Sequence, residues 1–323
     1  MSKRRIVLFA LIGAVAALWL GNTSAFHAPP SDAGPKLIAH RGVHQVFVGT
    51  RAVDGCKAAQ IAAPQHSYIE NTLPSMRAAF DAGADVVEID VHLTPDGVFA
   101  VFHDWTLDCQ TDGSGVTEET PWPVLKTLDI GYGFTAPDGS HPLRGKGRGM
   151  MPRLEDVLAL PGDTPAFLIN FKSNRAEEGQ ALATFLHADA ARARIWGVYG
   201  GARPTRAALE GVQGLKGLDR PNLRACITRY AALGWSGHVP PSCRDSILMI
   251  PINVAPWLWG WPHRFTARMK AAGAEVILVG PYGADGFISG IDDAQMLARV
   301  PRPFDGFLWT DRIELLGPML VQR

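Results

Sequence analysis

Residues 72–91 read TLPSMRAAFDAGADVVEIDV, and this stretch predicts one helix followed directly by one strand. Apolar residues recur at helical spacing from Leu73 to Phe80, and Gly83 suits the end of a helix. Residues 86–91 are then an apolar run rich in β-branched side chains, which is typical of a buried strand. A helix that leads straight into a buried strand is the repeating unit of folds built on parallel sheets.

The same alternation continues on both sides of this stretch. We predict further strands over residues 37–39, 99–102, 166–171, 195–199, 224–228, 247–252, 275–279 and 306–309. We predict helices over residues 72–82, 154–160, 177–188 and 265–272. Strands and helices that alternate over one long domain indicate parallel strands joined by helical crossovers. With about eight core strands and no Gly-x-Gly-x-x-Gly motif, the pattern favours an α/β fold of the closed (β/α)8 TIM barrel type over an open sheet.

The composition is that of a globular protein. The 323 residues carry 31 basic and 31 acidic side chains, so the formal net charge is zero. A nucleic acid held by bulk electrostatics would need a basic face, and we therefore predict no nucleic-acid partner. With 47% hydrophobic and 19% charged residues, the chain is neither disordered nor fibrous. A globular enzyme or a binding protein remains.

The N-terminal residues predict export. Three basic residues at positions 3–5 precede an apolar run at 6–20, and small residues follow up to Ala25. This order is the layout of a secretory signal, whereas a membrane span needs about 20 apolar residues and this run has fifteen. We favour a signal peptide over residues 1–25 that is cleaved after Ala25, with an uncleaved membrane anchor as the alternative. In both cases we expect the rest of the chain to be exported, to the periplasm or outside the cell.

Export changes the interpretation of the four cysteines, which are Cys56, Cys109, Cys226 and Cys243. Their spacing contains no Cys-x-x-Cys pair, so a zinc site or a thioredoxin-like motif is disfavoured. Two disulfides are expected in an oxidising compartment, although four cysteines allow three pairings. We favour Cys226–Cys243, which closes a short loop, and Cys56–Cys109, which would tie two insertions together. Four unpaired buried thiols are the alternative.

Carboxylates occur together on one predicted strand. Glu88 and Asp90 are two residues apart, so they share one face of the strand, and the apolar residues beside them take the other face. Both carboxylates therefore point into the barrel or its mouth. A hard divalent cation would relieve their repulsion, and a structural ion pair with Arg or Lys is the alternative.

Two histidines also lie at predicted strand ends. His40 and Arg41 end the first strand, with Gly42 allowing close approach of the backbone, and His103 follows the strand at 99–102. A histidine can transfer protons and an arginine can bind an anion. Together with the carboxylate pair, these residues suit in-line displacement at phosphorus, in which one histidine removes a proton and the other protonates the leaving oxygen.

The order of these motifs resembles the glycerophosphodiester phosphodiesterase family, which is related to the phospholipase C-like phosphodiesterases. The resemblance rests on His40-Arg41-Gly42, Glu70-Asn71-Thr72, Gly83-Ala84-Asp85, Glu88-x-Asp90-Val91, Thr94-x-Asp96-Gly97, His103-Asp104, Thr111-Asp112-Gly113-x-Gly115, Leu128-Asp129-x-Gly131, Met151-Pro152-x-Leu154-Glu155 and Asp305-Gly306-Phe307-x-x-Thr310-Asp311. It is dense over residues 36–172, thin over 190–300, and returns at the C-terminus. It implies a (β/α)8 barrel that uses a divalent cation, usually Ca²⁺ or Mg²⁺, to hydrolyse glycerophosphodiesters to glycerol 3-phosphate and an alcohol.

The resemblance also implies roles for individual residues. His40 and His103 would be the acid/base pair, and Arg41 would contact the phosphate. Glu88 and Asp90 would be metal ligands. A further carboxylate, that of Glu70 in the Glu-Asn-Thr motif, would approach the metal or hold the site together.

One departure from the family concerns the third metal ligand. The later strand of the family normally reads Glu-x-Lys, whereas this chain has Asn170-Phe171-Lys172. Lys172 keeps its phosphate-facing role, but the third ligand becomes a neutral amide, whose carbonyl oxygen can still bind a hard cation. Because the site loses one negative charge, we predict a weaker metal site.

The resemblance also suggests how the chain is divided. The prolines and the glycine within residues 29–35 predict a short linker over residues 26–35, and the barrel domain is expected over residues 36–323. The stretch at 43–69 is longer than the usual link in the family, and we expect it near the mouth of the barrel. Residues 105–150 match the small subdomain that the family inserts.

The sequence therefore predicts an exported, metal-assisted phosphodiesterase whose partner is a small glycerophosphodiester or a lysolipid. Related barrels cleave lysophospholipids or sphingomyelin-type lipids, and such a lipid is the alternative substrate. Three tryptophans could form an aromatic rim for it, or could instead pack a long loop: Trp257, Trp259 and Trp261. A binding barrel that has lost turnover is the other alternative, suggested by Asn170. Association with a membrane through the N-terminus also stays open.

Overall fold

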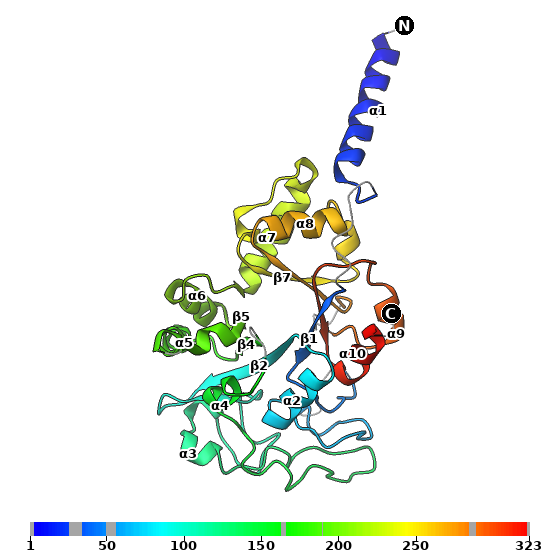
Figure 1. Ribbon diagram of the computed structural model, residues 1–323. Coiled ribbons are helices and arrows are strands. Elements are labelled where there is room, and N and C mark those ends of the chain that lie inside the picture. Colours follow the sequence, from blue (N-terminus) through cyan, green and yellow to red (C-terminus); the bar gives the residue numbers. More distant parts are fainter. Residues whose placement is uncertain are drawn as a thin grey trace.

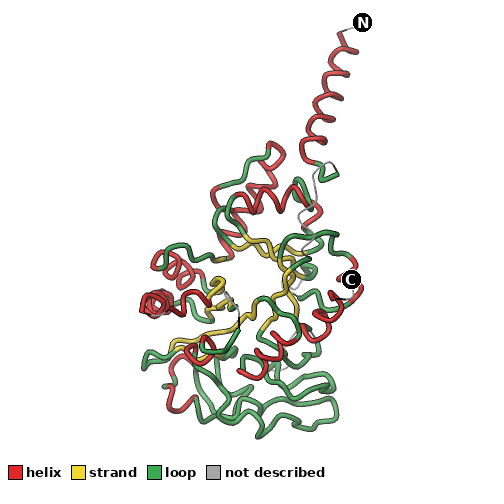
Figure 2. Tube along the Cα trace, in the orientation of Figure 1, coloured by secondary structure: helices red, strands yellow, loops and turns green. Residues whose placement is uncertain are grey.

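The computed structural model describes residues 3–25, 34–49, 56–162, 166–188, 190–283 and 289–321. Its centre is a nearly closed ring of eight parallel strands with helices around it (Figure 1, Figure 2). In the order of their pairing, these strands are β6 (Gly217–Leu218), β5 (Ile195–Gly200), β4 (Phe167–Phe171), β2 (Val86–Leu93), β1 (Lys36–His40), β9 (Phe307–Thr310), β8 (Glu275–Val279) and β7 (Ile247–Pro251). A ninth strand, β3 (Phe99–Val101), pairs antiparallel with the end of β2. The predicted (β/α)8 barrel is confirmed.

Ten α-helices are described. They are α1 (Lys3–Asn22), α2 (Leu73–Asp81), α3 (Trp122–Leu125), α4 (Leu154–Leu158), α5 (Ala176–Ala188), α6 (Ala202–Gly211), α7 (Arg220–Leu233), α8 (His263–Ala271), α9 (Ala294–Ala298) and α10 (Ile313–Val321). Short 3-10 turns are η1 (Thr117–Glu119), η2 (Ala190–Arg194), η3 (Gly234–Ser236), η4 (Pro241–Cys243) and η5 (Ala255–Trp257). The four predicted helices correspond to α2, α4, α5 and α8.

The strand predicted over residues 224–228 is wrong, because these residues lie within α7. Asp219 caps this helix, since its side chain accepts a hydrogen bond from the backbone N–H of Asn222 at 2.8 Å. Pro221 occupies the first turn, where a missing N–H costs nothing. These start signals outweigh the modest β propensity of the run that follows. The strand itself is only Gly217–Leu218, which is too short to produce a periodic pattern.

Alternation along β2 sorts its side chains between two layers. Val87, Ile89 and Val91 pack in the core between the sheet and the helices. Glu88 and Asp90 have the opposite parity and are fully buried, as expected for side chains that face the barrel interior. A cluster of buried apolar side chains also lies in the barrel and includes Ile38, Val86, Leu168, Ile277 and Trp309.

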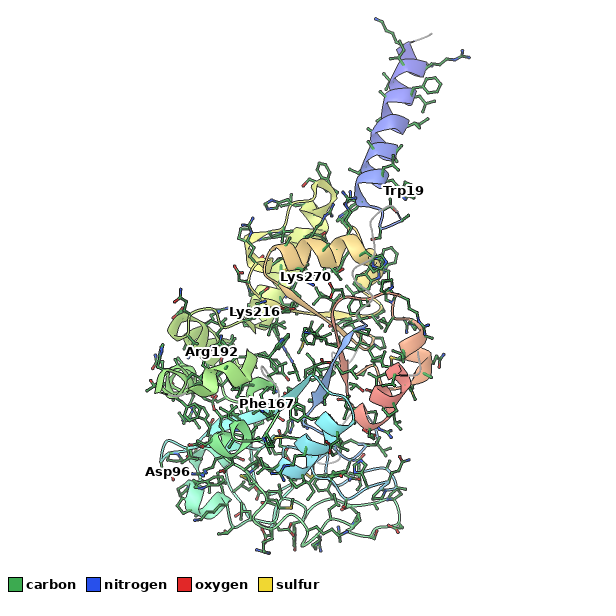
Figure 3. The ribbon with its side chains drawn as sticks, in the orientation of Figure 1. Trp19, Asp96, Phe167, Arg192, Lys216 and Lys270 are labelled. Atoms are coloured by element: carbon green, nitrogen blue, oxygen red, sulfur yellow. A yellow bond between two sulfur atoms is a disulfide. The ribbon has the colours of Figure 1, made fainter. Side chains whose placement is uncertain are left out.

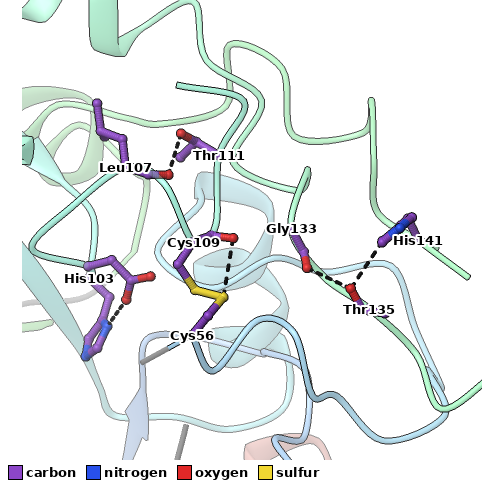
Figure 4. Close-up of a disulfide and its surroundings, with 9 residues drawn as sticks. Cys56, His103, Leu107, Cys109, Thr111, Gly133, Thr135 and His141 are labelled. Atoms are coloured by element: carbon purple, nitrogen blue, oxygen red, sulfur yellow. Dashed lines mark hydrogen bonds and ion pairs between the residues drawn. A yellow bond between two sulfur atoms is a disulfide. The ribbon is translucent and has the colours of Figure 1, made fainter. Parts of the chain in front are cut away.

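A second, smaller core lies beneath the long loops at one end of the molecule, around α3 (Figure 1). Its buried members include Ile61, Ile69, Phe102, Leu107, Phe134 and Leu143. Most of these side chains belong to the two expected insertions, which therefore pack against each other. The Cys56–Cys109 disulfide joins the same two segments, with a Cα–Cα distance of 5.2 Å (Figure 4).

The second disulfide is Cys226–Cys243, with a Cα–Cα distance of 4.9 Å. It ties α7 to η4, and both cysteines are completely buried. Both disulfides have the predicted pairing.

Replacing Cys226 and Cys243 together with alanine should lower the free energy of unfolding by about 3 kcal/mol. The bridge spans 17 residues, and closing a loop of that length restricts the unfolded chain by this amount. Urea denaturation of the oxidised wild type and of the double variant measures the difference. The matched change at Cys56 and Cys109, which are 53 residues apart, should cost about 4 kcal/mol. Equal stability of variant and wild type would contradict this account.

The N-terminal segment is a single helix, α1, that projects away from the barrel (Figure 1, Figure 3). Its 20 residues extend the fifteen-residue apolar run at both ends, and it is long and apolar enough to cross a membrane. Ile6, Phe9 and Val15 are each more than half exposed. The length of the segment therefore does not exclude a membrane span, and the helix and the disulfides are compatible with export.

Candidate active site

The predicted site residues gather where the parallel strands end. His40 ends β1 and is followed by Arg41, Asp90 lies on β2, and Asn170 lies on β4. These three strands are neighbours in the sheet. His103 reaches the same place from the loop after β3. Carboxyl ends of barrel strands are where TIM barrel enzymes hold their catalytic groups.

An unusual backbone turn presents the arginine. Arg41 has a left-handed conformation with φ of 58°, which costs an L-residue roughly 1–2 kcal/mol. Its backbone N–H donates to the carbonyl of Glu88 at 3.0 Å, and its carbonyl accepts from the N–H of Asn71 at 2.9 Å. Gly42 follows with φ of 81°, and a Cβ there would lie 2.6 Å from Oγ of Ser75. Only glycine fits this position, which explains the His-Arg-Gly order.

His40 has a carboxylate partner of its own. Its Nδ1 lies 2.5 Å from Oδ1 of Asp311, the residue directly after β9. Its Nε2 accepts a hydrogen bond from Nε of Arg41 at 3.1 Å. Burial and the charge of Arg41 lower the pKa of His40 below 6.5, and the carboxylate of Asp311 offsets only part of this effect. At neutral pH, His40 is therefore a neutral imidazole whose basic nitrogen is Nε2.

His103 is built in the same way. Its Nδ1 lies 2.6 Å from Oδ1 of Asp104. Burial and Arg41 hold the pKa of His103 well below 6.5. Burial and the nearby Glu70 raise the pKa of Asp104 to about 6. In both histidines a carboxylate orients Nδ1 and leaves Nε2 for proton transfer, the arrangement by which carboxylates position catalytic imidazoles.

The carboxylate of Asp90 contacts four other side chains of the cluster. Its buried carboxylate accepts hydrogen bonds from the side-chain amides of Asn71 at 2.9 Å and Asn170 at 2.8 Å. Nε of Arg41 lies 3.2 Å away, and Nζ of Lys172 lies 3.5 Å away. Burial alone would raise the pKa of Asp90, but Lys172 and Arg41 hold it well below its usual range. Asp90 is therefore ionised and organises two cations.

The other two carboxylates of the cluster are less well compensated. Glu88 accepts hydrogen bonds from the hydroxyl of Tyr199 at 2.6 Å and from the backbone N–H of Arg41 at 3.3 Å. Burial and the negative charge of Asp90 raise the pKa of Glu88 to about 8. One oxygen of Glu70 lies 3.2 Å from Arg41, and the other is buried with no hydrogen-bond partner among the described residues. Three carboxylates thus face two permanent cations.

Two groups of side chains could hold a metal ion. The predicted oxygen donors on β2 and β4 form one group, with Asn170 as its neutral member. The other group was not predicted and consists of His40, His44 and Asp311, whose ligand atoms lie within 4.8 Å of one another. Nε2 of His44 is buried and has no hydrogen-bond partner in the described part of the chain. The His-x-x-x-His spacing from His40 to His44 is the only sequence signal for this group.

Four side chains in the cluster had no predicted role: Asn71, Asp104, Tyr199 and Asp311. Asn71, Asp104 and Asp311 belong to motifs that carried the family resemblance, so those motifs could have suggested them. No sequence motif marks Tyr199 as a site residue. It lies on β5, and only folding places β5 beside β4 and near the site.

His40 lies on the walls of two cavities at the mouth of the barrel. One has a volume of about 570 Å³, and its apolar lining includes Trp105, Leu218, Leu223, Met249 and Trp309. The other has a volume of about 640 Å³, and its polar lining includes His44, Lys57 and Asp292. A phosphodiester bound beside His40 has room for an alcohol group in each cavity. A third cavity, of about 650 Å³, contains none of the predicted site residues.

The three tryptophans that were considered as an aromatic rim lie away from the predicted site residues. Trp259 donates from Nε1 to the carbonyl of Ala231 at 2.8 Å, and Trp261 packs against Phe265. Trp257 is 83% exposed. None of these three tryptophans lines the two cavities beside His40.

Comparison with known sequences agrees with this geometry. Residues 62–203 match the model of the Glycerophosphoryl diester phosphodiesterase family. This segment, which is less than half of the chain, is similar to that family. A glycerophosphodiester phosphodiesterase of Bacillus altitudinis is 34% identical over 106 residues, which cover 33% of this chain and 40% of the relative. One of Caldanaerobacter subterraneus is 36% identical over 103 residues, which cover 32% and 39%. The matches thus span about two fifths of the curated relatives.

Solved structures of glycerophosphodiester phosphodiesterases share the fold over most of the chain. A glycerophosphoryl diester phosphodiesterase domain from Mycobacterium tuberculosis aligns with a TM-score of 0.63 and 18% identity, covering 89% of this chain and all of that one. The glycerophosphodiester phosphodiesterase of Agrobacterium tumefaciens aligns with a TM-score of 0.57 and 20% identity, covering 88% and 99%. An Oleispira antarctica phosphodiesterase in complex with the product sn-glycerol-3-phosphate aligns with a TM-score of 0.54 and 19% identity, covering 90% and 97%.

Proposed function

We propose that this protein is an exported phosphodiesterase that hydrolyses glycerophosphodiesters to glycerol 3-phosphate and an alcohol by metal-assisted general acid–base catalysis. The observation that carries the proposal is the pair of half-buried histidines, His40 and His103, each with a carboxylate on Nδ1. Both lie beside Arg41, which can bind a phosphate, and Lys172 lies in the same cluster. The Oleispira antarctica phosphodiesterase is in complex with the product sn-glycerol-3-phosphate, and this supports a glycerophosphodiester as the substrate here.

In the proposed reaction, Arg41 and Lys172 bind the non-bridging phosphate oxygens and stabilise their developing charge. One histidine takes a proton from the nucleophile through Nε2. The other must first be protonated at Nε2, and it then donates that proton to the leaving oxygen. The nucleophile is either water or the 2-hydroxyl of the glycerol, and the hydroxyl would give a cyclic phosphate that water then opens. Reaction in ¹⁸O-water followed by mass spectrometry tests hydrolysis, since a phosphate product without label would contradict it.

The residues on β2 and β4 fit a divalent cation. All the donors are oxygens, which suit Ca²⁺ or Mg²⁺, and a cation between them would offset the burial and the repulsion by Asp90 that raise the pKa of Glu88. One buried oxygen of Glu70 has no hydrogen-bond partner among the residues that the structure describes, and a cation could supply one. Glu88 and Asp90 would hold the ion with the carbonyl oxygen of Asn170. When bound, the ion would neutralise charge on the phosphate.

Removal of divalent cations should abolish most of the activity, and added Ca²⁺ or Mg²⁺ should restore it. Because Asn170 contributes no charge, Asn170→Glu should lower the dissociation constant of the cation by about tenfold. Isothermal titration calorimetry with Ca²⁺ measures the constant, and an exposed change such as Asp138→Asn should leave it unaltered. Full activity in a chelator-treated sample that no cation increases would contradict the metal site.

The first experiment is an activity assay on the full-length chain in detergent micelles. Release of glycerol 3-phosphate is measured from glycerophosphocholine and glycerophosphoethanolamine, with Ca²⁺, with Mg²⁺ and with EDTA. Metal-dependent release supports the proposal. Binding of the substrates without release, by a folded and disulfide-intact sample, would instead support a binding barrel that has lost turnover.

A lysophospholipid is the second candidate substrate, since the cavity of about 570 Å³ has an apolar wall that could receive an acyl chain. Leu218, Leu223 and Met249 form this wall, and Arg220 lies beside it. Assays of lysophosphatidylcholine against glycerophosphocholine separate the two substrates. A higher kcat/KM for the lysolipid that falls selectively in Leu223→Ser would favour the lipid.

A further inference from the structure

The last turn of α1 is attached to the barrel by specific polar contacts. The side chain of Asn22 is buried, and its amide donates to the carbonyl of Trp235 at 2.8 Å. Its carbonyl oxygen accepts from Arg268 at 3.1 Å. Arg268 also donates to the carbonyls of Gly21 at 3.4 Å and Gly234 at 3.0 Å. One half-buried arginine therefore joins α1, η3 and α8.

The next residues continue this attachment at the beginning of α8. The first N–H groups of a helix have no partner within the helix and need a cap. Pro262 at the N-cap position provides no side-chain hydrogen bond. Oγ of Ser24 provides the missing cap, because it accepts hydrogen bonds from the backbone N–H groups of His263 at 3.1 Å and Arg264 at 3.2 Å. The same hydroxyl donates to the carbonyl of Gly260 at 2.7 Å. Ser24 thus caps α8 from another part of the chain.

A secretory signal is removed after export, and cleavage after Ala25 would remove both Asn22 and Ser24. The barrel would then lose the cap of α8 and the buried partner of Arg268. A segment that is discarded has no reason to complete the fold of the mature protein. We propose that α1 is retained as a membrane anchor, docked on η3 and α8 through Asn22 and Ser24, and that the adjoining surface rests on the lipid bilayer.

The surface of α1 fits a lipid environment. Apolar side chains face outward all round it, with Leu8, Leu11 and Leu20 each at least half exposed. A helix that is apolar on every face is stable where lipid covers it. The basic residues at positions 3–5 place its N-terminus on the cytoplasmic side, so the barrel lies on the opposite, oxidising side.

Exposed apolar side chains surround the point where α1 meets the barrel. Trp19 lies in the last turns of α1 (Figure 3) and is 59% exposed. Trp235, whose carbonyl holds Asn22, is 48% exposed, and Leu233 is 45% exposed. Tryptophans are enriched at the level of lipid headgroups. This set, defined as Trp19, Leu233 and Trp235, is the proposed membrane contact surface.

The docked anchor also fixes how the active-site end of the barrel is oriented relative to the membrane. Leu233 ends α7, and Arg220 at the start of the same helix lines the cavity of about 570 Å³ beside His40. Fourteen helical residues span about 20 Å. One rigid helix therefore links the membrane contact surface to the active-site cavity. This inference does not depend on the reaction that the site performs.

The first test is expression of the full chain in a bacterial host with membrane fractionation. The protein is expected in the membrane fraction after a carbonate wash, with an intact mass that includes residues 1–25. A soluble product that begins at Phe26 would overturn the proposal, whatever its enzymatic activity.

The second test addresses docking. Ser24→Ala should lower the melting temperature of the micelle-bound protein by about 2–4 °C, the shift expected for loss of a helix cap in a domain of this size. Hydrogen exchange at the amides of His263 and Arg264 should become at least about fivefold faster. Thr23→Ala is the matched control, because Oγ1 of Thr23 accepts a hydrogen bond only from the nearby N–H of Ala25 within the described part of the chain. Equal behaviour of the two variants would overturn docking.

The third test locates the bilayer. The native cysteines are all in disulfides, so a cysteine introduced by Leu233→Cys can be labelled alone with a fluorophore. In vesicles of phosphatidylethanolamine and phosphatidylglycerol, a quencher on the lipid headgroup should reduce its emission at least about twofold. A label at Asp138→Cys, in the insertion at the end of the molecule away from α1 (Figure 1), should keep its emission. Equal quenching of both labels would overturn the membrane contact surface.

Discussion

Replacing His40 or His103 with alanine should reduce kcat for glycerophosphocholine by about 10²–10⁴-fold. Each imidazole is held at Nδ1 by a carboxylate and presents Nε2 for proton transfer, and a positioned acid or base contributes a factor of this size. Initial rates of glycerol 3-phosphate release measure the loss. His238→Ala, which changes an exposed histidine, is the matched control and should keep the wild-type rate.

The same two variants distinguish the general acid from the general base. A substrate whose leaving group is p-nitrophenol departs without protonation, so the variant that lacks the acid should recover most of its activity on it. The variant that lacks the base should not. If both variants hydrolysed glycerophosphocholine as fast as the wild type, the assignment of these histidines to catalysis would be contradicted.

Asp90→Asn should lower kcat/KM by about 10³-fold and the free energy of unfolding by about 3 kcal/mol. The substitution keeps the shape of the side chain but removes the charge that pairs with Arg41 at 3.2 Å and Lys172 at 3.5 Å. Two buried cations would then lack a counter-charge, and breaking a buried ion pair from one side costs roughly 3–5 kcal/mol. The catalytic loss follows because both cations are proposed to hold the phosphate.

Urea denaturation and steady-state kinetics measure the two effects of Asp90→Asn. Asp305→Asn is the matched control, since Asp305 pairs with the largely exposed Lys270 at 2.8 Å and such surface pairs contribute less than about 1 kcal/mol. A stable and fully active Asp90→Asn variant would remove Asp90 from the centre of the site.

The barrel and the parity of its central strand could be predicted from sequence because both are periodic properties. The two-residue repeat of β2 puts Glu88 and Asp90 on one face whatever the neighbouring strands are. The strand at 217–218 cannot be predicted in this way, because two residues contain no period. Residues 224–228 have a composition that suits a strand, but Asp219 and Pro221 start the helix α7 before them.

The partners within the site could be predicted only in part. Motif order indicated His40, Arg41, Glu88, Asp90 and His103 as one site, and the structure gathers them into one cluster. It could not indicate that Asp311, 271 residues from His40 along the chain, is the carboxylate at its Nδ1. Nor could it indicate that the hydroxyl of Tyr199 completes the surroundings of Glu88.

The sequence by itself determined the local properties of this protein, which are the strand–helix alternation and the face on which each carboxylate lies. These depend on residues that are near one another along the chain. Only the tertiary structure decided which charges compensate one another, and therefore which groups are ionised. It also decided that Ser24, within the segment expected to be removed, caps a helix that begins 239 residues later. Burial and distance set those properties, and both arise only when the ring of strands closes and distant segments meet.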